Sequence, residues 1–158
     1  MLFRSTTANG PSGGKIEIQS GDTTLVSGTI EAKGLGDSLA TAGGEGGGEG
    51  GTIHVLGNKV GLIDSARIDA SGDAGGGTVL VGGDFQGKNP EVQNAYRTYF
   101  GLNASVAADA VTSGDGGKVI VWADDITRFY GSISARGGLQ SGNGGFVEIG
   151  RASCRERV

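Results

Sequence analysis

The sequence contains few of the residues that would place it in a familiar functional class. It has one histidine, His54, and one cysteine, Cys154, so the partners that a catalytic or metal-binding histidine needs are missing. No apolar run approaches the roughly 20 residues of a membrane-spanning helix, and residues 1–7 do not resemble a signal peptide. The formal net charge of −4 argues against a nucleic-acid partner held through its phosphates. Prolines number only two and glycine does not recur at every third position, which excludes collagen.

What the sequence does contain is a glycine-rich repeat. Gly-Gly pairs begin five copies of one unit, at residues 13, 50, 76, 116 and 144. The unit has the form Gly-Gly-x-(Ile/Val)-x-(Ile/Val), then a bend, then (Ile/Val)-x-Ala-x-Gly. Its most complete copy is GGKVIVWADDITRFYGSISARG, over 116–137. The glycines cluster at the boundaries of the unit, which indicates tight bends or close backbone approach at those points.

The apolar residues within each copy alternate with polar ones, as they do in a half-buried strand. Ile16 and Ile18 face one way while the residues around them face the other. A single copy has too few apolar side chains to form a core, but stacked copies would bury them in columns. We therefore predict an all-β chain, a right-handed parallel β-helix of about five coils over 13–150, after a polar leading segment at 1–12. A β-sandwich is the alternative, but it predicts hairpins and no positional repeat.

Two insertions interrupt the repeat. Successive Gly-Gly pairs are 37, 26, 40 and 28 residues apart, and loops leaving a constant coil explain the two long intervals. The first insertion, near 35–49, is rich in glycine and indicates a flexible loop. The second, near 86–102, carries three aromatic side chains: Tyr96, Tyr99 and Phe100.

The alternation also predicts which side chains face outward. On the first strand of each copy these are Glu17, His54, Leu80, Ile120 and Glu148, and on the second they are Glu31, Asp69, Ala107 and Ser134. Glu31 and Asp69 could be adjacent, but no base or column of cations continues such a site. Carboxylates in glycine-rich bends, such as Asp115, favour ordinary turns over Ca²⁺ sites because no tandem motif repeats them. The sequence therefore predicts no catalytic, metal-binding or cofactor-binding residue.

Apolar side chains on the outward face need either a cover or a partner. Those concerned are Leu80, Ile120 and Trp122. We expect the insertion near 86–102 to cover them, with its aromatic residues as the lid. The alternative is an exposed strip for glycan or protein contact, whose residues would be Leu80, Ile120, Trp122, Tyr96 and Tyr99.

Three segments, GDGGKVIVWADDITRFYGSISARGG, GNGGFVEI and GGTVLVGGDFQG, resemble the repeat region of filamentous-haemagglutinin-family exoproteins, the passengers of two-partner secretion. The resemblance covers most of 13–149 and is most specific over 114–149. It implies a β-helical fibre that an outer-membrane β-barrel transporter exports to the bacterial cell surface, with a host-cell or glycan ligand possible. The family's amino-terminal secretion domain is not recognisable here, so the resemblance implies that this chain belongs to the shaft of such a fibre.

Two classes of function follow. The favoured one is a non-catalytic shaft segment of a secreted adhesin, and the alternative is a polysaccharide-active enzyme or glycan-binding module on the same scaffold. A fragment with open strand edges should self-associate when expressed alone.

The last residues do not continue the repeat. RASCRERV, over 151–158, extends a string from Glu148 that resembles one reading frame of a sequencing adapter. We interpret it as a non-native tail; a genuine basic tail is the alternative. Without these residues, which hold three Arg and one Glu, the net charge would be −6 rather than −4.

Overall fold

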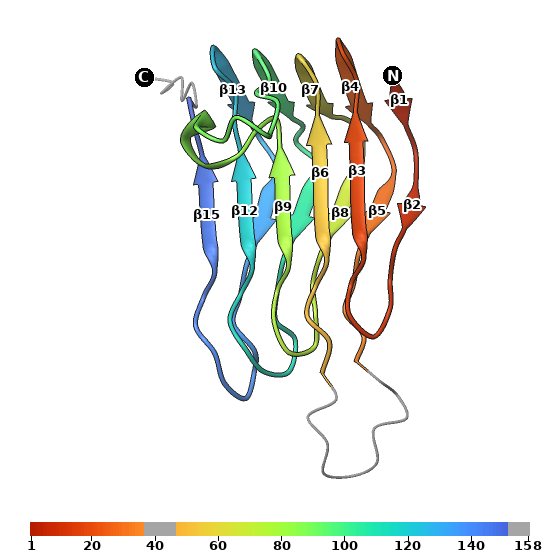
Figure 1. Cartoon of the computed structure of the whole chain (residues 1–158), viewed down its shortest axis with the longest axis vertical. Coiled ribbons are helices and arrows are strands. Elements are labelled where there is room, and N and C mark those ends of the chain that lie inside the picture. The colour runs from red at the N-terminus through yellow and green to blue at the C-terminus, as the bar shows by residue number, and fades with distance from the viewer. Residues whose placement is uncertain (37–46, 152–158) are drawn as a thin grey trace.

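The computed structural model describes residues 1–36 and 47–151, and it shows a parallel β-helix. Three parallel sheets of five strands each run along the solenoid, from the amino-terminal coil to the carboxy-terminal one (Figure 1). This confirms the predicted all-β architecture of about five coils. Within the described ranges, no helix is long and apolar enough to cross a membrane.

Each sheet collects one strand from every coil. The front sheet of Figure 1 contains β3 (Lys15–Gln19), β6 (Thr52–Leu56), β9 (Thr78–Val81), β12 (Lys118–Val121) and β15 (Phe146–Ile149). The second sheet contains β1 (Leu2–Phe3), β4 (Thr23–Val26), β7 (Lys59–Leu62), β10 (Arg97–Phe100) and β13 (Ile126–Phe129). The third sheet contains β2 (Thr6–Thr7), β5 (Thr29–Glu31), β8 (Arg67–Asp69), β11 (Ser105–Ala107) and β14 (Ser132–Ser134).

A complete coil therefore has three strands, one more than the repeat predicts. The second sheet was missed because its interior rows include polar residues: Thr24, Thr98 and Thr127 are buried. The Thr24 and Thr98 hydroxyls donate to backbone carbonyls, Leu56 O at 2.8 Å and Trp122 O at 2.6 Å. Thr24 and Thr98 can thus occupy the core because their hydroxyls bond to the neighbouring coil. The Thr127 hydroxyl, in the last complete coil, has no such partner among the described residues.

The core consists of columns of equivalent residues in successive coils. Val79, Val119 and Val147 are in register, as predicted, and the first two are completely buried. Val147 is 43% exposed because it lies in β15, the last strand of the front sheet. Phe100 is fully buried against Phe129, with ring centroids 4.5 Å apart.

The Gly-Gly pairs close the corner between the third sheet and the front sheet. Gly51 N donates to Ala32 O at 2.7 Å, and the four equivalent bonds are Gly14 to Ala8, Gly77 to Ala70, Gly117 to Ala108 and Gly145 to Ala135, at 2.7 to 2.8 Å. A Cβ on Gly116 would overlap the carbonyl oxygen of Ala135. Here glycine is required by close backbone approach, and the adjacent alanine suits the same tight corner.

The ends and insertions differ in part from the sequence-based boundaries. The leading segment 1–12 contributes β1 and β2, which pair with β4 and β5. In the first insertion, residues 37–46 lie outside the described residues, while Glu49 already bridges to Gly75 of the next coil. The second insertion ends before β10, so the strand at 97–100 belongs to the coil. Residues 152–158 also lie outside the described residues.

Candidate functional site

The outward rows predicted from the repeat are present. Glu17, His54, Leu80, Ile120 and Glu148 are in register on the front sheet. Leu80 and Ile120 are nevertheless buried, with exposed fractions of 3% and 0%. His54 is partly buried, and burial lowers its pKa from the ordinary value of 6.5, which favours the neutral imidazole.

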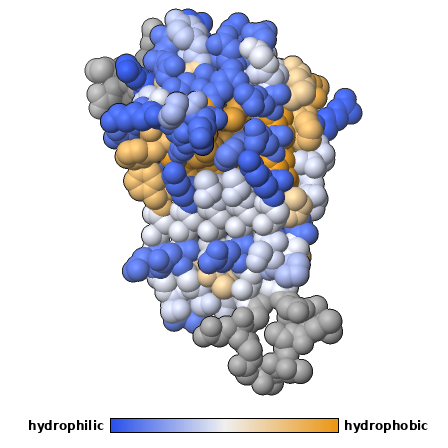
Figure 2. All heavy atoms as spheres, in the orientation of Figure 1, coloured by the Kyte–Doolittle hydropathy of each residue, from blue (hydrophilic) through white to orange (hydrophobic). Residues whose placement is uncertain are grey.

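A short segment, 84–94, covers the outward apolar residues of the front sheet; we call it the lid. It starts at Asp84, whose carboxylate accepts from Phe85 N at 2.7 Å and pairs with Lys118 at 3.1 Å. It then forms the 3-10 turn η1 (Phe85–Gly87). Hydrogen bonds connect the lid to both edge strands of the front sheet. The Gln19 amide of β3 donates to Gln93, and Gln86 N donates to Glu148 of β15. Figure 2 shows hydrophilic atoms lying over hydrophobic ones on this face.

Trp122 anchors the lid, and the predicted aromatic residues do not form it. The Trp122 indole donates to Asp124 at 2.9 Å, and the Asn94 amide reaches the same carboxylate at 3.2 Å. Gly87, at φ +64°, lies so close to the indole that a side chain there would collide with it. A cover is present where it was expected, but with other residues: Phe100 is in the core, Tyr99 lies on the second sheet, and Tyr96, which is 49% exposed, follows the lid. Contact roles for Tyr96 and Tyr99 stay predictions.

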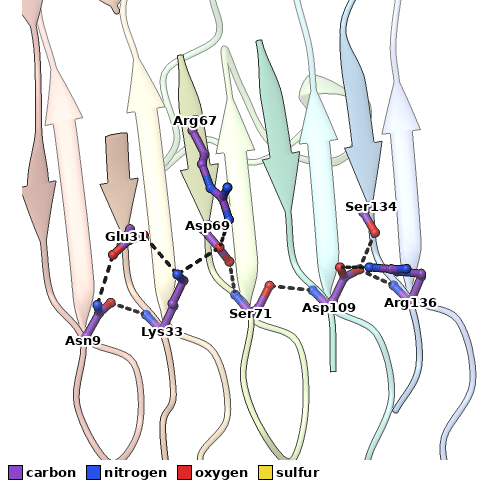
Figure 3. Close-up of polar contacts among 9 residues, drawn as sticks. All are labelled: Asn9, Glu31, Lys33, Arg67, Asp69, Ser71, Asp109, Ser134 and Arg136. Carbon is purple, nitrogen blue, oxygen red and sulfur yellow. Dashed lines mark hydrogen bonds and ion pairs between the residues drawn. The ribbon is translucent and has the colours of Figure 1, made fainter. Parts of the chain in front are cut away.

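The main constellation of charged side chains lies along the third sheet. We call it the polar ladder, and Figure 3 shows its nine residues: Asn9, Glu31, Lys33, Arg67, Asp69, Ser71, Asp109, Ser134 and Arg136. Glu31, Asp69 and Ser134 belong to the outward row predicted from the sequence, with Ala107 between the last two. Five others follow two residues later, where the chain leaves the strand, so the ladder extends across all five coils.

At one end of the ladder, Lys33 joins two carboxylates from adjacent strands. Its Nζ lies 3.0 Å from Glu31 and 3.3 Å from Asp69, which are register partners in β5 and β8. Asp69 is 4% exposed and also accepts from Arg67 at 3.0 Å and from Ser71 N at 3.1 Å. Asn9 continues the contacts to the amino-terminal coil by donating to Glu31 at 3.2 Å.

At the other end, Asp109 joins the last two complete coils. Its carboxylate accepts from Arg136 N at 2.7 Å, from the Arg136 guanidinium at 3.1 Å and from the Ser134 hydroxyl. Its backbone N donates to the Ser71 hydroxyl at 3.2 Å. Every one of these contacts connects a residue of one coil to a residue of the next.

The ladder corrects the expectation that no cations accompany Glu31 and Asp69. Lys33, Arg67 and Arg136 were missed although a usable signal existed. Each lies two residues from an outward position, and in a strand i and i+2 share a face. Applying the same alternation one step beyond the predicted strands would have found them.

The electrostatics of the ladder hold its carboxylates in the ionised form. Burial alone would raise the pKa of Asp69, but hydrogen bonds from Ser71 and Arg67, with the charge of Lys33, hold it below the ordinary value. Burial would also raise the pKa of Asp109, but hydrogen bonds from Arg136 and Ser134 lower it below the ordinary value. The hydrogen bond from Lys33 lowers the pKa of Glu31, and that from Glu31 raises the pKa of Lys33.

These shifts define what the ladder can do chemically. It borders a groove of about 590 Å³, but a carboxyl group that acts as a general acid needs a raised pKa, and a lysine that acts as a general base needs a lowered one. The ladder has the opposite arrangement, which suits attraction between coils. Among the described residues, no group of three or more His, Cys, Asp or Glu is placed to hold a metal ion. Asp115, in a glycine-rich bend, accepts from Asn143 N at 2.7 Å in a contact with the next coil.

Comparison with known proteins places the fold. The chain is similar to the crystal structure of the HMW1 secretion domain from Haemophilus influenzae, with a TM-score of 0.63 and 22% sequence identity. The similarity covers 98% of this chain and 44% of that one, so this chain spans less than half of its neighbour. At such low identity the likeness shows the fold alone. No protein-family model and no curated protein sequence matches the chain.

Proposed function

We propose that this chain is a non-catalytic structural segment of the shaft of a large secreted bacterial surface protein of the adhesin type. The observation that carries the proposal is the polar ladder. Its polar groups bond from coil to coil along the solenoid, through ion pairs at Lys33–Asp69 and Arg136–Asp109 and through uncharged donors or acceptors at the other steps. Charges used in this way stabilise the stack of coils, which is the task of a shaft.

The fold of the similar structure and the sequence resemblance support the cellular setting. The neighbour is named a secretion domain, and the repeat resembles passengers of two-partner secretion. We therefore propose export to the cell surface or medium through an outer-membrane β-barrel transporter. Within the described residues, β15 and the amino-terminal strands are edge strands of their sheets. Exposed strand edges pair with other chains, so the isolated chain is expected to self-associate.

An export experiment tests the shaft assignment. The chain is expressed with a two-partner transporter in two forms, alone and fused behind the secretion domain that this transporter recognises. A shaft segment reaches the surface only in the fusion, where it should be folded and resistant to protease. Export of the chain alone would show that it acts as a secretion domain, and failure of the fusion to export would contradict both assignments.

An activity screen tests the enzyme alternative. The whole chain is incubated with neutral and acidic polysaccharides, and release of new reducing ends or unsaturated products is measured. We expect none, because each ladder carboxylate is ionised and bonded to a cation. Turnover that disappears in Asp69→Asn but persists in Asp125→Asn would establish the groove beside the ladder as an active site.

A further inference from the structure

The outward face of the second sheet has a groove that none of the contacts above uses. It lies over β4, β7, β10 and β13 and has a volume of about 570 Å³. We call it the open groove. The residues that matter for its properties are Leu25, Lys59, Gly61, Arg97, Tyr99 and Arg128.

The floor of the open groove is a glycine that the backbone does not need. Gly61 lies in register between Leu25 and Tyr99, and its φ is not among the positive values found at other glycines. A Cβ on it would meet only side chains, the flexible end of Leu25 at 2.8 Å and Ile63 at 3.6 Å. Glycine inside a strand weakens it, and such a position often marks the close approach of a ligand. Gly61 is itself buried, so it shapes the groove by letting the Leu25 side chain lie across its position, and a side chain at 61 would push Leu25 outward.

The charge of the open groove is opposite to that of the whole chain. Three cations, Lys59, Arg97 and Arg128, line it with one carboxylate, Asp125, whereas the chain carries a net −4. Asp125 pairs with Arg97 at 3.0 Å. Across residues 1–36 and 47–151, neither Lys59 nor Arg128 forms an ion pair. Lys59 and Arg97 are direct register partners, and adjacent like charges destabilise a sheet. Asp125 offsets part of the Arg97 charge, and an external anion beside Lys59 would relieve the rest of the repulsion.

An exposed aromatic surface lies beside these cations. Tyr99 is 43% exposed and Tyr130 is 54% exposed, with their ring centroids 5.9 Å apart. Tyr99 stands next to Gly61 on one side and Arg128 on the other, in successive strands. An exposed ring of this kind can stack on a flat, partly apolar ligand while its hydroxyl stays hydrated.

We propose that the open groove binds an acidic polysaccharide whose sugar rings carry carboxylates, a polyuronate. One ring stacks on Tyr99 above Gly61, and carboxylates of the polymer pair with Lys59 and with the fork of Arg128. Neighbouring coils are about 4.8 Å apart, close to the length of one pyranose unit in an extended chain. Successive sugars can therefore follow successive coils. This binding role goes beyond the structural role proposed above and does not depend on it.

Affinity electrophoresis of the whole chain through gels containing polygalacturonate tests the proposal. We expect retardation of the wild type by polygalacturonate but not by neutral dextran. Gly61→Val fills the floor and should weaken binding about tenfold or more. Lys59→Gln and Arg128→Gln should each weaken it by roughly three- to tenfold, more at low salt than at high salt. Lys15→Gln removes the same charge from the front sheet and should leave binding unchanged.

Each other outcome overturns the proposal. Absence of retardation of the wild type does so, as does unchanged binding in Gly61→Val and both charge variants. Retardation by sulfated polysaccharides but not by polygalacturonate would overturn the carboxylate assignment. Retardation by polyglutamate or nucleic acid in place of polygalacturonate would overturn the saccharide assignment. Thermal unfolding of every variant verifies that it is folded. If Gly61→Val is unfolded, Lys59→Gln and Arg128→Gln decide the test.

Discussion

The polar ladder and the open groove lie on neighbouring sheets of the same solenoid but use their charges differently. In the ladder every carboxylate accepts from cations or backbone amides, and Asp69 is 4% exposed. In the open groove the cations outnumber the single carboxylate, and both members of its ion pair are more than a third exposed. The difference shows that charge on this scaffold can stabilise the stack at one face and remain available to a ligand at another.

The largest effect expected from this comparison comes from removing one carboxylate at each face. Asp69→Ala should lower the free energy of unfolding by about 2–3 kcal/mol, because it leaves Lys33 and Arg67 without their buried partner. Asp125→Ala should cost much less, since its pair with Arg97 is exposed. Urea denaturation of both variants measures the difference. Equal losses would show that the ladder does not stabilise the coils.

Acid should weaken the ladder next most strongly. Glu31, Asp69 and Asp109 have lowered pKa values in the folded chain, so the folded state binds their protons less readily than the unfolded state does. Their stabilisation is complete above the ordinary pKa values of 4.5 for Glu and 3.8 for Asp. It is lost as the pH falls through the lower folded values.

Denaturation curves between neutral pH and pH 2 measure this loss. Asp69→Asn should show a shallower decline than the wild type, because one of the linked carboxyls is gone. A variant with the same pH dependence as the wild type would contradict the role given to Asp69.

Removing the bridging cation gives a smaller effect. Lys33→Met leaves Glu31 and Asp69 adjacent without the charge that separates them and should cost about 1–2 kcal/mol at pH 7. Lys59→Met, the matched change in the open groove, should stay within about 0.5 kcal/mol. The Lys33→Met penalty should shrink in acid as the carboxyls become neutral. A penalty independent of pH would indicate lost packing instead of lost charge.

The smallest effect should come from filling the open groove. Gly61→Val is expected to change the free energy of unfolding by no more than about 1 kcal/mol, because the preference of valine for strands offsets the cost of displacing Leu25 from this buried position. Thermal and urea unfolding measure it. A large destabilisation would mean that the fold itself requires glycine at 61, which would remove the main reason for regarding the groove as a binding site.

The sequence predicted much of the fold and part of the candidate site. The repeated Gly-Gly pairs set the register between coils, and the two-residue alternation placed Glu17 beside His54 and Glu31 beside Asp69, as the structure has them. The cations of the ladder were missed because the alternation was not followed past the strand ends. The lid was placed correctly, but its aromatic residues were misassigned because β10 was included in the insertion.

The amino-acid sequence by itself determined the interior columns, the tight glycine corners and the outward rows, because these depend on local periodicity and on backbone space. Only the tertiary structure decided the third strand of each coil, the pairing of Lys33 with two carboxylates and the open groove over the second sheet. Each of these depends on which residues of different coils meet, since Thr24 and Thr98 are satisfied by carbonyls of the next coil. The sequence of a single repeat does not show which residues of neighbouring coils come into contact.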